Sequence, residues 1–105
     1  MHAPYHDYVN DMLRQYFAPA CKPIPPGSVA ELNRAVTASV VSGFSRRQRA
    51  ILRDIFSEPE QPLGPLIKKC AESHNMPEMN IWHTIRAASR KIARERGLID
   101  QDGRE

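Results

Sequence analysis

MNIWHTIRAASRKIARER, residues 79–96, is the most strongly patterned stretch of this sequence. Successive residues of a helix lie about 100° apart, so residues three or four positions apart share a face. One face of the stretch collects the apolar residues Ile81, Ile85, Ala88 and Ile92, and the opposite face collects His83, Arg86, Arg90 and Arg94. The pattern predicts a long helix that buries its isoleucines and presents guanidinium groups to an anionic partner.

A shorter apolar helix is predicted just before this stretch, and its inward-facing residues are Leu66, Ile67, Cys70 and Ala71. The segment SHNMP, residues 73–77, makes a tight connection between the two helices. Pro77 suits a first helical turn, and Gly97 suits a helix end. Two helices joined in this way indicate a helix-turn-helix, in which the second helix enters a DNA groove.

The length and charge of the chain agree with this interpretation. The 105 residues carry a net charge of +3 and fit one domain, or one domain with an appended arm. Residues 46–96 hold eleven Lys or Arg and six Asp or Glu, whereas the remainder holds two more acids than bases. Positive charge gathered in this way is typical of a nucleic-acid-binding face, although a solvated helical surface has the same composition.

The sequence favours a soluble protein of the cytoplasm. Two cysteines, Cys21 and Cys70, are too few for a disulfide framework, which indicates a reducing compartment. No apolar run approaches the roughly 20 residues that span a bilayer. The first eight residues lack the basic start and apolar centre of a secretion signal.

Residues 1–27 are predicted to form an N-terminal arm. Helical spacing of apolar residues, three tyrosines among them, predicts a helix over Tyr5–Phe17 that docks on the rest of the chain. Residues 18–27 contain four prolines and favour an extended spacer over a proline-rich recognition motif. Residues 28–99 then form the helical helix-turn-helix domain, and residues 100–105 form a disordered tail.

Two capping boxes mark the helices in between. Ser28 and Glu31 open one helix, which ends near Gly43 and is expected to bury Leu32, Val36 and Val40. Ser45 and Gln48 open the next helix, with Ile51, Leu52, Ile55 and Phe56 inside. Residues 58–65 contain three prolines and are predicted to be a loop, with Pro62 as one candidate start of the following helix. No alternating strand pattern is present, so we expect an all-α fold of five helices.

The second half of the chain resembles the fourth conserved region of bacterial sigma factors. FSRRQRAIL, residues 44–52, is similar to the opening of that region, and LIKKCA, residues 66–71, falls where the first helix of its helix-turn-helix lies. NMPEMNIWH, residues 75–83, matches the turn and the start of the recognition helix, and ASRKIAR, residues 88–94, matches its basic end. The whole chain is also similar to small sigma-like regulators of phages and conjugative elements.

The recognition helix departs from the family pattern at its start. Sigma factors often carry Arg, Glu and Gln there and read the −35 promoter element, whereas this chain carries Glu78, Met79, Asn80, Trp82 and His83. Readout of that element therefore does not carry over. Nothing in the sequence corresponds to the part of a sigma factor that melts promoter DNA, so we do not expect a complete sigma factor.

Double-stranded DNA is the partner that this pattern predicts. Lys and Arg attract phosphates of any sequence by releasing condensed counterions, and five such contacts give a log–log salt slope of about −4.5. Asn80 can pair with adenine and Arg86 with guanine, each contact being worth about 1–3 kcal/mol of discrimination. The candidate DNA-contacting residues are Arg46, Arg47, Lys68, Lys69, Asn80, His83, Arg86, Arg90 and Arg94. The alternative for the arginines is a solvated surface paired with Glu72 or Glu95.

Trp82 lies between the two faces of the predicted long helix. The favoured interpretation is a packing residue that seats the tyrosine-rich first helix, and the alternative is stacking on DNA.

Metal and catalytic sites are not expected. Cys70 and His74 lie four residues apart and can share a helix face, but further zinc ligands would have to come from His6, Cys21 or His83. Cys70 also fits a buried apolar stripe, which is a poor setting for a nucleophile. No glycine-rich phosphate loop is present. We therefore predict no metal, no cofactor and no enzymatic activity.

Two functions remain after these exclusions. The preferred one is a sequence-specific DNA-binding transcriptional regulator, in which the first helix completes the core or mediates a homodimer. The alternative is a protein-interaction module that binds RNA polymerase or inhibits a host nucleic-acid machine, with its arginine face against an acidic protein.

Overall fold

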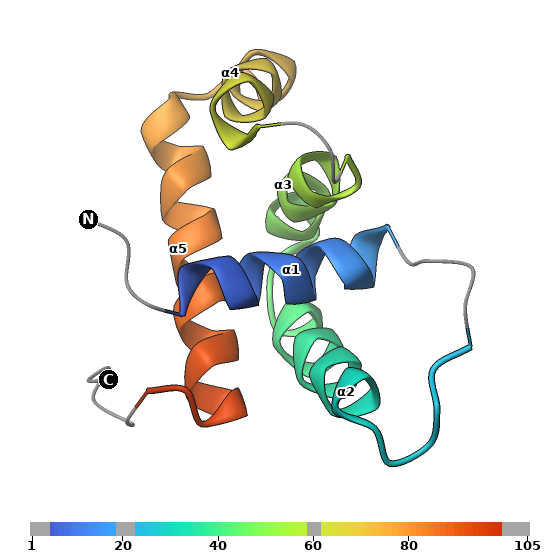
Figure 1. Cartoon of the computed structure of the whole chain (residues 1–105). Helices are drawn as coiled ribbons and strands as arrows, with labels where there is room; N and C mark the ends of the chain where they lie inside the picture. Colours follow the sequence, from blue (N-terminus) through green and yellow to red (C-terminus); the bar gives the residue numbers. More distant parts are fainter. Residues whose placement is uncertain (1–4, 19–22, 59–61, 100–105) are drawn as a thin grey trace.

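The computed structural model describes residues 5–18, 23–58 and 62–99 (Figure 1). These residues form five helices and no strand, which confirms the predicted all-α fold with its five helices. The helices are α1 (His6–Phe17), α2 (Val29–Ser42), α3 (Arg46–Phe56), α4 (Leu63–His74) and α5 (Glu78–Arg96). Pro19, Cys21 and the predicted tail at 100–105 lie outside the described residues.

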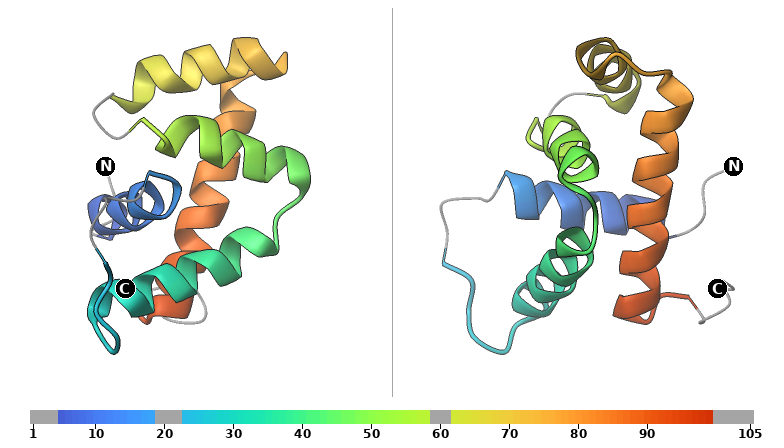
Figure 2. Two further views of the ribbon diagram at one scale, coloured as in Figure 1. Left: turned by 90° about the vertical axis from the view of Figure 1, so that its right-hand side faces the viewer. Right: turned by 180° about the vertical axis from the view of Figure 1, so that it is seen from behind.

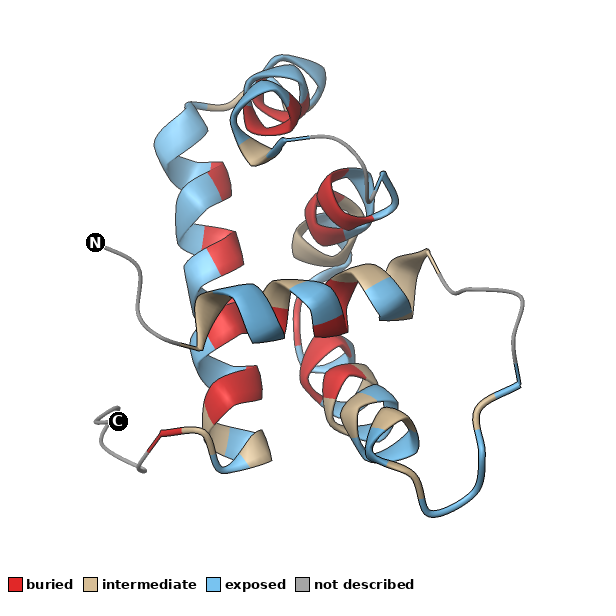
Figure 3. Cartoon of the chain, in the orientation of Figure 1, coloured by how far each residue is buried: buried red, intermediate tan, exposed pale blue. Residues whose placement is uncertain are grey.

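The long helix α5 is the element on which the others pack. It contacts α1, α2, α3 and α4, and its buried side faces them while its outer side is exposed (Figure 3). Figure 2 shows α4 at one end of the molecule and α2 at the other, with α3 between them. The arrangement leaves one side of α5 open to solvent between Met79 and Arg90.

One core joins all five helices. The helix α1 contributes Val9, Met12 and Leu13 to it, so α1 docks within the same chain against α2, α3 and α5. Phe56 and Leu52 of α3 are fully buried, as is Ile67 of α4. The inward residues expected for α3, α4 and α5 are all buried.

The expected buried side of α2 is partly wrong. Val40 is buried, but Leu32 is 48 % exposed and Val36 only half-buried. Thr37 and Val41 line the core instead. The Thr37 Oγ1 donates to the Asn33 carbonyl at 2.7 Å, and this satisfied hydroxyl allows a polar residue to occupy a fully buried position.

The capping box at α3 is present as predicted. The backbone N–H of Gln48 donates to the Ser45 Oγ at 3.1 Å, and the backbone N–H of Ser45 donates to the Gln48 Oε1 at 3.0 Å. The capping box predicted at α2 forms only in part, because its second hydrogen bond comes from the residue before the cap. The Ser28 Oγ accepts from the Glu31 amide at 3.2 Å, but the Glu31 Oε1 accepts from Gly27 rather than from Ser28.

Replacing the α3 cap should destabilise the fold measurably. Ser45→Ala leaves the Gln48 amide without its acceptor, and we expect a loss of about 1 kcal/mol in the free energy of unfolding. Urea denaturation followed by circular dichroism measures this change. Ser39→Ala, at an exposed position inside α2, is the matched control and should change stability by less than about 0.5 kcal/mol. Equal losses in the two variants would contradict the capping role.

The helix α4 starts earlier than the predicted loop allows. Pro62 is its N-cap residue, and Gly64 and Pro65 fall in its first turn. A proline costs little there because the first amide groups of a helix have no intrahelical acceptor. The predicted loop at 58–65 is therefore too long at its C-terminal end, whereas Pro62 as the candidate start of the helix is confirmed.

The turn between α4 and α5 is only three residues long, Asn75 to Pro77. Asn75 takes the left-handed conformation with φ 53°, and the Met76 amide donates to the Ala71 carbonyl at 3.0 Å. Gly97 ends α5 in the same way with φ 81°, after which Ile99 folds back and is buried.

None of the helices in the described part of the chain combines the length and apolar character that crossing a membrane requires.

Candidate nucleic-acid interface

The helix α5 is continuous over its 19 residues and has two chemically distinct sides. Ile81, Ile85, Ala88 and Ile92 face the core as predicted. The opposite side is open to solvent along the upper part of the helix (Figure 3). Its exposed residues include Met79, Asn80, Trp82, His83, Arg86 and Arg90, and we call these six the outer face of α5.

The arginines of the outer face form no ion pair with any acidic residue that the structure describes. Among the described residues, ion pairs join only Arg14 to Asp11 at 3.7 Å and His74 to Asp54 at 2.8 Å. The alternative in which Arg86 and Arg90 pair with the chain's own acids is therefore not observed in that part of the chain. Their charges remain available to an anionic partner.

Arg94 differs from the other arginines of α5. It is half-buried and lines a hollow with Val40 and Gly43 at the end of α2. Its Nε is buried and makes no hydrogen bond among the described residues. The predicted arginine series along α5 therefore keeps Arg86 and Arg90 on the open side, while Arg94 lies against α2.

The beginning of α3 lies beside the end of α4 (Figure 2, left). Arg46 and Arg47 are both exposed there, and the Arg47 Nη2 donates to the His74 carbonyl at 2.9 Å. A guanidinium at a helix C-terminus interacts favourably with the last carbonyls and the helix dipole. Arg47 thus ties α3 to the α4–α5 turn, and Arg46 is left beside it in solvent.

The two lysines of α4 are exposed on different sides of that helix. Lys68 lines a hollow of about 500 Å³ together with the turn residues Asn75 and Met76. Lys69 lines a separate hollow of about 310 Å³ with Asp54 and Cys70, between α3 and α4. Of the pair, Lys68 is therefore the one that borders the turn.

Two apolar side chains of the outer face are exposed to solvent, which the sequence did not predict. Met79 is 66 % exposed and Trp82 is 38 % exposed. They border a hollow of about 370 Å³ with His83 and Arg86. Trp82 also borders a second hollow with residues of α1, so it lies near the first helix as predicted. It is exposed, however, and is not among the partly buried residues that pack against the core, so the predicted packing role is not observed.

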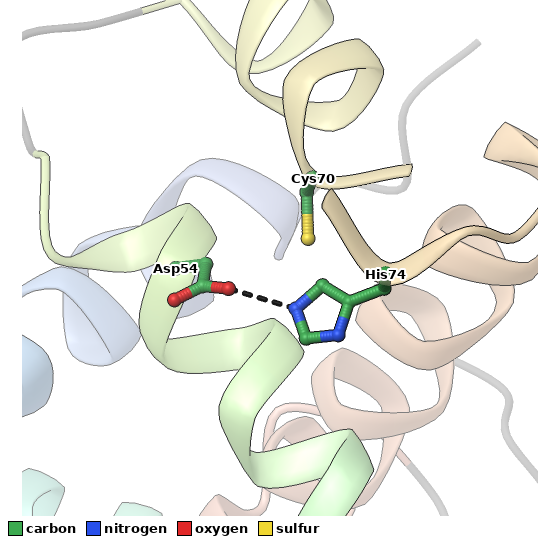
Figure 4. Close-up of side chains that lie close together, drawn as sticks. All are labelled: Asp54, Cys70 and His74. Carbon is green, nitrogen blue, oxygen red and sulfur yellow. Dashed lines mark hydrogen bonds and ion pairs between the residues drawn. The ribbon is translucent and has the colours of Figure 1, made fainter. Parts of the chain in front are cut away.

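Asp54, Cys70 and His74 form a cluster between α3 and α4 that the sequence did not predict (Figure 4). The His74 ring places its Nε2 2.8 Å from the Asp54 Oδ2, and Cys70 lies one helical turn before His74. Burial, and to a lesser extent the Asp54 carboxylate, raises the pKa of Cys70 from 9.0 to about 11. Together with Arg47, the Asp54–His74 contact holds the end of α4 onto α3 at two points.

Cys70 should therefore be an unreactive thiol in the folded, metal-free protein. At pH 8 a pKa of about 11 leaves roughly one thiolate in a thousand, against about one in ten for a pKa of 9.0. With Cys21→Ser as background, iodoacetamide in a chelating buffer should modify Cys70 at least about 100-fold more slowly in folded than in guanidinium-unfolded protein. Mass spectrometry gives the modified fraction over time, and rates within about tenfold of each other would contradict the expectation.

Comparison with protein-family models, with curated proteins and with solved structures finds no match to this chain.

Proposed function

We propose that this protein is a sequence-specific DNA-binding transcriptional regulator and that α4, the turn and α5 act as its helix-turn-helix. The observation that carries the proposal is the outer face of α5. It begins directly after a three-residue turn and presents Arg86 and Arg90 without acidic partners in the described part of the chain. A helix held on four others by one side and basic on the other suits insertion into the major groove.

The contacts divide by chemistry. Arg46, Lys68 and Arg90 bind phosphates on either side of the groove, and these contacts are independent of sequence. Asn80 and Arg86 read bases, adenine and guanine being their preferred partners. Arg47 supports this arrangement indirectly because its bond to the His74 carbonyl fixes the start of α3 against the turn.

The resemblance to the fourth region of sigma factors supports the same assignment. It covers residues 44–96, the segment that contains α3, α4 and α5. By that resemblance the protein is a small regulator of a phage or another mobile element, in the cytoplasm of a bacterium.

Fluorescence anisotropy with a labelled random-sequence duplex tests DNA binding directly. We expect a Kd between about 1 and 100 μM at physiological salt for non-specific binding. On a random sequence Arg86 has no matching guanine and contacts a phosphate instead. Arg46, Lys68, Arg86 and Arg90 then make four cation–phosphate contacts, which give a slope of log K against log salt of about −3.6. No binding at low salt would overturn the proposal, and selection from a random DNA pool would then give no enriched sequence.

An interaction with a protein is the alternative, and the apolar exposure on the outer face favours it. Met79 and Trp82 lie beside Arg86, and exposed aromatic residues next to arginine are typical of protein-binding hot spots. RNA polymerase, or another nucleic-acid machine that the protein inhibits, is the partner this alternative names. Capture of purified polymerase that is lost in Trp82→Ala, together with failure to bind DNA, would support it.

A further inference from the structure

Three side chains with metal-binding atoms meet between α3 and α4. Asp54 comes from α3, while Cys70 and His74 come from successive turns of α4, and Figure 4 shows all three directed toward one space. Their ligand atoms all lie within 4.8 Å of one another. We propose that Asp54, Cys70 and His74 bind a Zn²⁺ ion, a site that is independent of the proposed DNA-binding function.

The donor set selects zinc by its chemistry. A sulfur, an imidazole nitrogen and a carboxylate oxygen are the three ligand types that proteins use for Zn²⁺. Mg²⁺ and Ca²⁺ prefer oxygen ligands throughout, so the Cys70 sulfur disfavours them. Two of the further ligands considered from sequence lie outside this cluster, since His83 is exposed on the outer face of α5 and His6 belongs to α1, while Cys21 lies outside the described residues.

The geometry needs only small side-chain shifts. Zinc–ligand distances of about 2.0–2.3 Å in a tetrahedron place neighbouring ligand atoms about 3.3–3.8 Å apart. The His74 Nε2 and the Asp54 Oδ2 are now 2.8 Å apart and would separate slightly, and no pair exceeds 4.8 Å. Because Cys70 and His74 are four residues apart on one helix, they share a face without any change in the backbone.

A fourth ligand has room to enter. Asp54 and Cys70 line the hollow of about 310 Å³ between α3 and α4, which opens to solvent and has room for a water as the fourth ligand. As the Sγ–Zn bond forms, the Cys70 proton leaves to solvent. His74 coordinates through Nε2, so the Nε2 proton that now faces Asp54 leaves to solvent and the neutral ring carries its single proton on Nδ1. The ion replaces the Asp54–His74 hydrogen bond with a firmer link between α3 and the end of α4.

Titration of the metal-free full chain with Co²⁺ tests the site, because a cobalt–thiolate bond gives a charge-transfer absorption band that binding to His and Asp alone does not. We expect one Co²⁺ per chain, that band, and its loss when Zn²⁺ is added. Cys70→Ser should abolish the band. Loss of a supporting group near a metal costs about 10–100-fold in affinity, so loss of the ligand in Asp54→Asn should weaken Zn²⁺ binding at least about 100-fold.

Matched variants outside the cluster separate a built site from loose binding. Cys21→Ser and Asp11→Asn make the same chemical changes elsewhere and should leave the affinity within about threefold. At Zn²⁺ a hundredfold above its Kd, the wild-type Tm should rise by at least about 10 °C. Asp54→Asn keeps an acceptor for His74, so circular dichroism should show it folded without metal. Absence of the charge-transfer band, or its persistence in Cys70→Ser, would overturn the proposal.

Discussion

Replacing Arg86 and Arg90 together with alanine is expected to weaken DNA binding roughly 60-fold at 0.1 M salt. On a random-sequence duplex Arg86 has no matching guanine and contacts a phosphate, as Arg90 does. Each phosphate contact contributes about −0.9 to the slope of log K against log salt, so losing both contacts makes the slope less negative by about 1.8. If the wild type and the variant bind equally at 1 M salt, this difference in slope makes their binding constants differ by a factor of about 60 at 0.1 M salt. Anisotropy titrations at several salt concentrations measure both the slope and the affinity.

A second double variant controls for net charge. Arg34→Ala with Arg53→Ala removes the same two charges from exposed positions on α2 and α3. Because neither residue lies on the outer face of α5, the affinity should change by less than about threefold and the slope should remain near the wild-type value. If both double variants weakened binding equally, general electrostatic attraction would explain the interaction and α5 would have no special role.

The sequence predicted α5 well because its pattern needs no tertiary information. Four apolar residues at helical spacing leave one way to bury the helix, and the basic residues then face outward. The C-terminal end of α5 shows what periodicity alone does not predict. Arg94 has the same spacing as Arg86 and Arg90, yet α2 packs beside it and removes it from the open side. Periodicity gives the face of a helix but not which neighbour covers it.

The contacts that hold the turn could not be found from sequence. Arg47 and His74 are 27 residues apart, and Asp54 and His74 are 20 apart, with a proline-containing connection between them. Only the packing of α3 on α4 brings these groups together. The same packing brings Asp54 next to Cys70 and His74. The four-residue spacing of Cys70 and His74 predicts two metal ligands at most, and the third comes only from the contact between α3 and α4. The burial of Thr37 was missed for a different reason. Its hydroxyl donates to a carbonyl of its own helix, and this hydrogen bond removes the penalty for burying a polar side chain.

Phe56→Ala is expected to cause the largest loss of stability among the substitutions considered. Phe56 is fully buried at the end of α3, and truncating a buried phenylalanine costs about 3–5 kcal/mol. Total stability for a domain of this size is about 5–15 kcal/mol, so the variant retains between about 0 and 12 kcal/mol and its Tm should fall by at least about 10 °C. Leu32→Ala is the matched control, because Leu32 is 48 % exposed and should cost less than about 1 kcal/mol.

The same variant tests whether DNA binding needs the folded platform. If the outer face of α5 binds DNA only when the other helices hold it, Phe56→Ala should bind normally at a temperature where it is folded and lose binding along its melting curve. Circular dichroism and anisotropy recorded on the same temperature series measure this. Binding that persists after unfolding would mean that the basic segment acts as a charged peptide. The groove-docking geometry proposed for α5 would then be wrong, even though the protein still bound DNA.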